Sequence, residues 1–261
     1  MLLENKNAIV YGAAGSIGTA VSTTFAREGA RVFLVGRTRE TLEQLAKEIT
    51  EAGGRAEVAA LDVLDEEAVD GHARSVLDSV GSIDVSINLV SGGDLQGIPI
   101  ADMTTADYTR PIRTRLTANF ITARAAARHM TKQGSGVILA LDSGSAQASP
   151  MMGGTGSADA ATDALIRNLA FEIGPAGVRV LGIWTAGLPE TLSLEKVNAH
   201  SGGQLEQAAF DGILAHLEGM RMTRRSPTLA QVAATAAFLA SDHAGAITGT
   251  FVNVTSGTFP S

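Results

Sequence analysis

The sequence predicts an α/β fold in which one doubly wound parallel sheet of about seven strands carries helices on both faces. Short apolar segments alternate with longer segments of helical period along the whole chain. The first of these segments is a strand, a glycine-containing turn and a helix, between Asn7 and Arg27. The strands are apolar throughout, which indicates a sheet that is buried on both faces. A parallel sheet follows, because crossover helices have to cover both faces.

Length and composition fit one large domain. The chain has 261 residues, of which 45% are hydrophobic, so a sizeable core can be buried. The formal net charge of −7 argues against nucleic acid or an anionic membrane as the main partner. The sequence has no cysteine, which excludes a disulfide framework, a thiolate nucleophile and a cysteine metal site. The first residues lack the apolar core of a signal peptide and no apolar run reaches membrane-spanning length, so we expect a cytoplasmic protein.

The first strand, turn and helix predict an anion site. Residues 8–11 form a short apolar strand that stops at Gly12, and apolar residues then recur with helical spacing from Ile17 to Phe25. Free backbone N–H groups and the positive end of the helix dipole converge at such a turn. A side chain at Gly12 would keep the backbone away from a pyrophosphate, and one at Gly18 would hold the helix off the strand. An ordinary tight turn between a strand and a helix is the alternative.

The rest of the chain continues the alternation. Pro111 should disturb the longest helix. The stretch 185–227 has no clear period and is predicted to be irregular. We find no internal repeat, low-complexity tract or linker, so residues 1–261 form a single domain, with a substrate-lid region around 190–225. The later strands are predicted at 31–35, 56–61, 85–90, 136–141, 178–183 and 251–254, and the later helices at 38–52, 65–80, 104–132, 157–173 and 229–240.

These segments resemble the short-chain dehydrogenase/reductase family, over nearly the whole chain. The first turn resembles that family's Thr-Gly-x-x-x-Gly-x-Gly, with Tyr11 in the threonine place and Ser16 in the middle glycine place. Asp62-Val63 resembles the Asp-Val pair that contacts the adenine ring, and Asn88 is the one match to the family's Asn-Asn-Ala-Gly. Further similarity lies in segments 168–173, 177–180, 225–227, 238–242 and 247–249.

The resemblance implies a Rossmann-type, NAD(P)-binding oxidoreductase that acts on a small molecule. Family members are commonly tetramers or dimers that pack their long fourth and fifth crossover helices together. The small residues in 118–130 and 161–171 would allow such close approach. By the same resemblance, the cofactor would be bound by Gly12, Ala14, Gly15, Ser16, Ile17, Gly18, Arg37, Asp62, Val63, Asn88, Val90 and Thr191.

The end of the second strand favours NADP(H) over NAD(H). Enzymes that bind NAD place an acid there for the ribose hydroxyls, and this acid would repel a 2′-phosphate. Here the segment after Val35 reads Gly36-Arg37-Thr38-Arg39, without an acid. Guanidinium groups offer planar, charge-assisted donors that suit phosphate. We therefore expect Arg37 to contact the phosphate and Arg39 to be solvated. NAD(H), or no nucleotide at all, is the alternative.

The chain departs from the family at the catalytic positions. The family uses a serine, a tyrosine with a lysine four residues later, and an asparagine on the preceding long helix. The tyrosine is the acid/base, and the lysine lowers its pKa from the usual value of about 10. Counting from Ser143, the tyrosine place is Gly156 and the lysine place is Ala160. Counting back from Met130, the asparagine place holds Arg115.

Ser143 and Arg115 are therefore the candidate catalytic residues. Arg115 is long enough to lean into the space that the missing side chains leave, where it would orient an anionic or carbonyl oxygen beside Ser143. An arginine on the helix surface is the alternative. Asp142 and Asp159 are interpreted as solvated or capping carboxylates. No metal site is expected, because metal-ligand spacing is missing among His72, His129, His200, His216 and His243.

Three function classes remain open. The first is an NADP(H)-dependent oxidoreductase whose proton relay is rebuilt from Ser143, Arg115 and either Asp142 or water. The second is an enzyme of another reaction type, such as a lyase or isomerase, that uses the cleft without net hydride transfer. The third is a catalytically silent subunit that binds nucleotide, or nothing, and acts by assembly. Binding of NADPH and a panel of carbonyl substrates would separate them.

Overall fold

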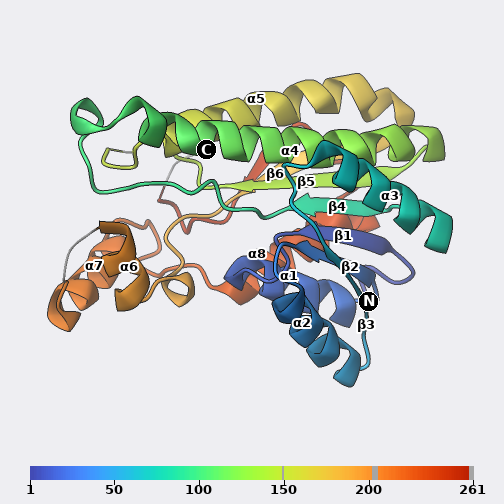
Figure 1. Ribbon diagram of the computed structural model, residues 1–261, viewed down its shortest axis with the longest axis horizontal. Coiled ribbons are helices and arrows are strands. Elements are labelled where there is room, and N and C mark those ends of the chain that lie inside the picture. Colours follow the sequence, from blue (N-terminus) through green and yellow to red (C-terminus); the bar gives the residue numbers. More distant parts are fainter. Residues whose placement is uncertain (149, 202–204, 259–261) are drawn as a thin grey trace.

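The described residues form one parallel sheet of seven strands in the order β3-β2-β1-β4-β5-β6-β7, in the computed structural model of the chain (Figure 1). The structure describes residues 1–148, 150–201 and 205–258. The strand order reverses between β1 and β4, and such a switch point opens a crevice at the carboxyl ends of the strands. The strands are β1 (Asn7–Tyr11), β2 (Arg31–Gly36), β3 (Arg55–Ala60), β4 (Val85–Asn88), β5 (Gly136–Asp142), β6 (Val178–Trp184) and β7 (Phe251–Asn253).

Helices cover both faces of the sheet, which confirms the predicted doubly wound α/β fold (Figure 1). Helices α1, α2 and α8 pack on one face, and α3, α4 and α5 pack on the other. Their bounds are α1 (Ser16–Arg27), α2 (Arg39–Glu51), α3 (Glu66–Val80), α4 (Thr105–Gln133), α5 (Thr155–Ile173) and α8 (Leu229–Ala240). No helix among the described residues is long and apolar enough to cross a lipid bilayer.

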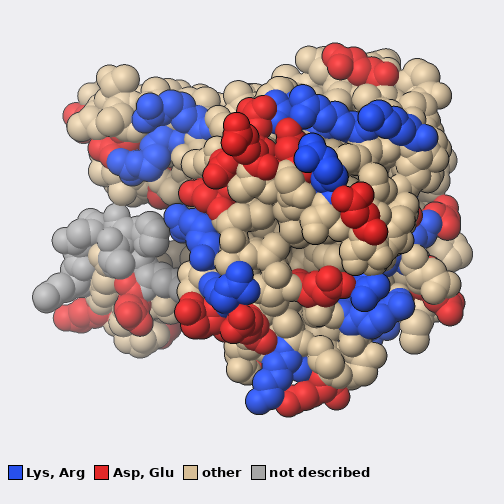
Figure 2. All heavy atoms as spheres, turned by 45° about the vertical axis from the view of Figure 1, so that its right-hand side comes forward, with Lys and Arg blue, Asp and Glu red and all other residues tan. Residues whose placement is uncertain are grey.

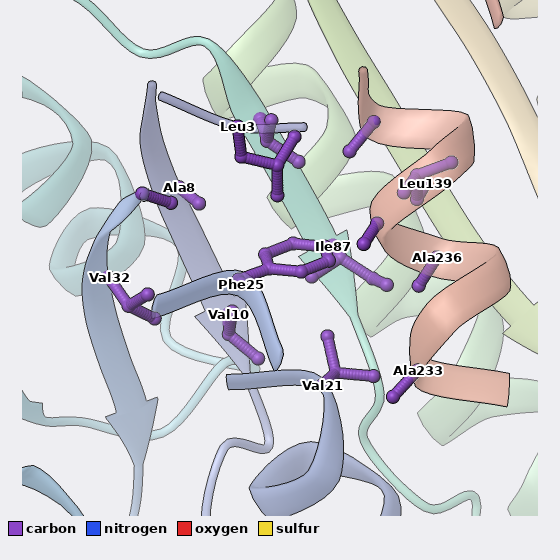
Figure 3. Packing of buried hydrophobic residues seen from close by; sticks show 14 of the residues in the cluster. Leu3, Ala8, Val10, Val21, Phe25, Val32, Ile87, Leu139, Ala233 and Ala236 are labelled. Carbon is purple, nitrogen blue, oxygen red and sulfur yellow. The ribbon is translucent and has the colours of Figure 1, made fainter. Parts of the chain in front are cut away.

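The core between the sheet and α1 holds this helix against β1 and β4. Phe25 of α1 is fully buried and lies among side chains of β1, β4 and α8, such as Val10, Ile87 and Ala236 (Figure 3). Burial of a phenylalanine side chain is worth about 1.5–3 kcal/mol. The packing of Phe25 therefore fixes how α1 approaches the crevice.

Local signals in the sequence explain where several helices begin. The Thr104 side chain accepts the N–H of Asp107 at 3.1 Å, which caps α4, and Thr228 forms a reciprocal capping box with Gln231 at the start of α8. Helix α4 continues through Pro111, where the sequence predicts a disturbance. Pro111 lies in the second turn, and its buried ring packs close to Gly154, so tertiary contacts offset the lost helical hydrogen bond.

The prediction that residues 185–227 are irregular is wrong. Two helices, α6 (Leu194–Ser201) and α7 (Gln207–Gly219), lie in this stretch, set apart from the sheet (Figure 1). Phe210 is buried, whereas Ile213 on the same helix is exposed. A short helix that buries so little of its apolar face gives a weak periodic signal. The lid assignment to 190–225 stays a prediction, and positions 202–204 lie outside the described residues.

Candidate active site

The turn after β1 presents an uncapped helix start at the carboxyl edge of the sheet. Gly12 has φ +76°, a conformation that favours glycine. Gly15 is the N-cap of α1, no side chain caps the helix, and its first turn holds no acid. Ala14, Gly15 and Ser16 are exposed. Free N–H groups and a positive helix end that face solvent fit the pyrophosphate of a dinucleotide.

Close packing makes glycine necessary at two positions of this turn. A Cβ atom at Gly18 would lie 2.1 Å from the Gly12 carbonyl oxygen, so Gly18 lets α1 approach the strand, as the sequence predicts. A Cβ atom at Gly12 would lie 3.0 Å from the carbonyl oxygen of Leu89, just after β4. Gly12 therefore has to lack a side chain for two reasons: the chain after β4 passes close to it, and a bound phosphate would approach it.

The ends of β2 and β3 hold the residues assigned to the adenosine half. Arg37 is exposed and forms no ion pair with any described residue, whereas Arg39 lies 3.5 Å from Glu43, between nitrogen and oxygen. Asp62 Oδ1 accepts the N–H of Leu64 at 3.0 Å and shapes the exposed turn after β3. The Arg37 guanidinium is therefore available to a phosphate group.

The remaining cofactor candidates make internal contacts. Asn88 is buried, its Nδ2 donates to Asn119 Oδ1 at 2.7 Å, and its Oδ1 accepts the N–H of Val90 at 3.2 Å. Thr191 Oγ1 donates to the Leu188 carbonyl at 2.8 Å in a short 3₁₀ turn, η3 (Pro189–Thr191). Asn88 thus serves first to fix the chain after β4. Of the others, Ile17 and Val90 are half-buried and Val63 is buried.

A buried carboxylate, Asp159 of α5, joins the two predicted catalytic residues. Its Oδ2 accepts the hydroxyl of Ser143 at 2.5 Å and the hydroxyl of Ser145 at 2.7 Å. The same oxygen accepts the backbone N–H groups of Ser143 and Ser145 at 3.2 and 3.0 Å. Asp159 Oδ1 accepts a hydrogen bond from Arg115 Nη1. Arg115 and Ser143 therefore meet through one shared carboxylate.

Asp94, in the chain after β4, is the second partner of Arg115. Arg115 Nη2 lies 2.8 Å from Asp94 Oδ2, and Asp94 Oδ1 accepts the hydroxyl of Thr155 at 3.0 Å. The Arg115 side chain is only 11% exposed, which rules out the alternative of an arginine on the helix surface. One guanidinium faces two carboxylates, so this group of three carries one excess negative charge.

The interpretation of Asp142 and Asp159 as solvated or capping carboxylates is wrong. Asp159 is 0% exposed and Asp142 is 2% exposed. Burial first, and then the nearby Asp159 charge, raise the pKa of Asp142 to about 9, although the N–H of Gly144 donates to its Oδ1 at 2.9 Å. Burial and the neighbouring carboxylate thus favour the neutral form of Asp142. Its buried Oδ2 has no partner among the described residues.

Backbone closes the place that the resemblance assigns to a tyrosine. A Cβ atom at Gly156 would lie 2.8 Å from the Ser145 carbonyl oxygen, so no side chain fits there without a shift of the backbone. Ala160, in the lysine place, is exposed. Next to Gly156, the hydroxyl groups of Tyr108 and Ser157 lie 2.7 Å apart and join α4 to α5.

Four residues of this arrangement were not assigned to the site from the sequence: Asp94, Ser145, Tyr108 and Asp159. A signal for the two carboxylates was present, because a guanidinium that enters a cleft needs anionic partners. Asp94 follows the glycines after β4, and Asp159 lies three residues beyond Gly156. For Ser145 and Tyr108 the sequence offers no comparable signal.

The similarity to known proteins covers nearly the whole chain. A family model described as enoyl-(acyl carrier protein) reductase matches residues 12–258. The 7alpha-hydroxysteroid dehydrogenase of Escherichia coli is 29% identical, over 98% of this chain and 94% of that protein. The L-rhamnose 1-dehydrogenase (NAD(P)(+)) of Azotobacter vinelandii is 32% identical, over 99% of this chain and 98% of that protein. The crystal structure of NAD+-bound xylitol dehydrogenase has a TM-score of 0.87 at 27% identity, and the match covers 98% of this chain and 100% of that one. The chain belongs to the short-chain dehydrogenase/reductase family of oxidoreductases.

Proposed function

We propose that this protein is an NADP(H)-binding oxidoreductase with an altered active site, which has a network of serine, carboxylate and guanidinium groups and lacks the tyrosine and lysine of the family. The observation that carries the proposal is the shared carboxylate of Asp159, which links Ser143 to Arg115. Relatives that are named as dehydrogenases of hydroxysteroids and of rhamnose support a small-molecule alcohol or carbonyl compound as the substrate.

The chain's own residues provide the contacts for the nucleotide. The uncapped start of α1 and the turn at Gly12 would hold the pyrophosphate, and Arg37 would hold the 2′-phosphate. Ala160 offers no ammonium group to the nicotinamide ribose, so we expect that half of the cofactor to bind more weakly than it would with the family's lysine. When it is bound, the nicotinamide supplies hydride transfer.

The test is calorimetric titration of the protein with NADP(H) and NAD(H). We expect NADP(H) to bind more tightly, by about tenfold or about 1.4 kcal/mol, because the 2′-phosphate gains a charge-assisted contact. Arg37→Ala should remove this preference, whereas Arg39→Ala, the matched control whose guanidinium already faces Glu43, should keep it. Equal binding of both nucleotides, or a preference that survives Arg37→Ala, would refute the assignment.

A catalytically silent, nucleotide-binding subunit is the second candidate, and one observation favours it. The hydroxyl groups of Ser143 and Ser145 both point to Asp159, and both terminal nitrogens of Arg115 face carboxylates. The hydroxyl protons of both serines are therefore already donated inside the protein, and the Arg115 charge is already neutralised by carboxylates of the chain. Tight NADPH binding without oxidation of NADPH by any of a panel of ketones and aldehydes would favour this candidate. The cytoplasmic location stays a prediction.

A further inference from the structure

We infer that Ser143 Oγ meets the substrate as a hydrogen-bond acceptor, so the site selects a group that donates, a hydroxyl or a protonated amine, over a carbonyl or a carboxylate. The inference rests on the proposed function, because it takes Ser143 as the residue that contacts the substrate. It concerns the direction of one hydrogen bond, which the described contacts of Ser143 determine.

The hydroxyl proton of Ser143 is already used inside the protein. Asp159 Oδ2 lies 2.5 Å from Ser143 Oγ and 2.7 Å from Ser145 Oγ, and an ionised carboxylate only accepts. Ser143 Oγ also lies 2.8 Å from Ser145 Oγ and could donate to it instead, but a charged acceptor at shorter distance is the stronger partner. Both hydroxyl protons therefore point to Asp159, and Ser143 Oγ keeps its lone pairs.

Ser143 is the member of this trio that a ligand reaches. It is half-buried, whereas Ser145 and Asp159 are buried. A carbonyl oxygen placed beside Ser143 would face the lone pairs of Oγ and would gain no hydrogen bond from it. A hydroxyl or ammonium proton would instead complete the hydrogen bonding of Ser143.

The charge around the site also favours a ligand that donates a proton, above all a cation. Arg115 faces both Asp94 and Asp159, and the excess negative charge attracts a cation and repels a carboxylate. The inference therefore differs from the expectation that Arg115 orients an anionic or carbonyl oxygen beside Ser143, which stays a prediction. The guanidinium does reach the site, but two carboxylates of the protein already bind its terminal nitrogens.

Four probes with one carbon skeleton test the inference: cyclohexanol, cyclohexanone, cyclohexylammonium and cyclohexanecarboxylate. Each is titrated into the full chain, and binding is followed by NMR through the backbone amide signals of Ser143 and Ser145. We expect cyclohexanol and cyclohexylammonium to bind about tenfold more tightly than the ketone and the carboxylate. A ketone or carboxylate that binds equally well, or four probes that leave both amide signals unchanged, would overturn the inference.

Three variants separate the hydrogen bond from the charge. Ser143→Ala removes the acceptor and should abolish the preference for cyclohexanol over cyclohexanone. Asp159→Asn replaces the acceptor by an amide, which frees the Ser143 proton and should narrow or reverse that preference. The matched control Asp94→Asn removes one charge but no contact of Ser143, so it should keep the alcohol preference and narrow the preference for ammonium over carboxylate.

The outcomes distinguish this inference from the proposed function. An alcohol preference that survives Ser143→Ala overturns the inference, and this variant decides the matter if Asp159→Asn fails to fold. If the wild type binds NADP(H) but shows no preference for donor ligands, the inference is overturned and the proposed cofactor is not. Absence of NADP(H) binding overturns the proposed cofactor, and the donor preference then remains a property of the pocket.

Discussion

Asp159 determines what the neighbouring side chains of the site can do. It is a fully buried carboxylate whose partners come from two places in the chain, namely Arg115 on α4 and the serines after β5. A buried charge is tolerated only when its partners satisfy it, and removal of one partner typically costs about 3–5 kcal/mol. The Arg115–Asp159 pair therefore belongs both to the active site and to the packing of α4 against α5.

Asp142 makes the stability of the fold depend on pH. Its pKa is about 9 in the folded chain against an ordinary value of 3.8, so between these pH values the folded protein holds a proton that the unfolded chain has lost. Stability therefore falls as pH rises through this window, by up to about 1.4 kcal/mol per pH unit. Asp142→Asn cannot ionise, so its free energy of unfolding should lack this slope.

Urea denaturation at several pH values from about 5.5 to 8.5 measures this effect as the difference between the wild type and Asp142→Asn. The variant should gain stability relative to the wild type as pH rises. Asp211→Asn is the control, because it removes an exposed carboxylate and should leave the slope unchanged. Parallel curves for the wild type and Asp142→Asn would contradict the raised pKa.

The sequence predicts the place of Ser143 and of Arg115 but not their shared partner. Motif spacing fixes a residue relative to a strand end or a helix, which is why Arg115 was expected to face the cleft. The burial of Asp159 depends on how α5 packs on α4 and on the turn after β5, and a single sequence does not contain that geometry. A lone aspartate on a helix is usually solvated, so the general rule gave the wrong interpretation here.

At the scale of elements, the spacing of hydrophobic residues predicts a helix or strand correctly wherever the element buries a continuous apolar face. Helix α8 occupies the predicted residues 229–240, and each predicted strand lies within two residues of the observed one. The same reasoning missed α6 and α7, because much of their apolar surface is not buried against the sheet. What holds this region in place is a polar contact rather than an apolar stripe.

Arg221, just after α7, provides that contact. Its Nη1 donates to the Thr255 carbonyl at 3.0 Å and its Nη2 donates to the Gly187 carbonyl at 2.8 Å. Further bonds reach Ala186, Ser226 and Thr258, and the side chain is only 2% exposed. Arg221 therefore ties the end of α7 to the loop after β6 and to the chain after β7.

Arg221→Met should destabilise the protein by about 3 kcal/mol, because it leaves buried carbonyl groups without donors while it keeps most of the side-chain volume. Urea denaturation measures the loss, and amide hydrogen exchange should report faster opening of residues 186–187 and 255–258 than of the sheet. Arg225→Met, at a neighbouring exposed position, is the control and should change stability little. Equal stability of the two variants would show that Arg221 does not hold this region together.

At the scale of the whole molecule, the outer surface of α4 and α5 is unusually apolar in two places. Phe120 of α4 is 47% exposed and lines a groove of about 470 Å³ between these helices, and Phe171 of α5 is 85% exposed. The small residues that favoured close helix packing, such as Ala118, Ala125 and Ala126, are instead buried within the chain. The two phenylalanines, rather than the small residues, are therefore the candidates for contact with a second copy.

Charged side chains are paired beside this groove. Figure 2 shows Lys and Arg side chains in a row along the upper part of the molecule, with Asp and Glu close to them. On α4, Arg124 and Arg128 lie 3.4 and 2.7 Å from Asp70 of α3, measured from nitrogen to oxygen. Such paired charges add little affinity but form a polar rim around an apolar centre, which is the usual anatomy of an interface.

We expect the protein to form a dimer or tetramer through this face, and light scattering at micromolar concentration measures its mass. A stable interface buries at least about 1,200 Å² in total, and an exposed aromatic ring contributes about 150–250 Å². The double variant Phe120→Glu, Phe171→Glu should therefore be monomeric, because it places charges at the centre of the contact. Phe238→Glu, on α8 at the opposite face of the sheet, is the matched control and should leave the mass unchanged. A monomeric wild type, or an assembly that survives the double variant, would show that α4 and α5 do not carry the interface.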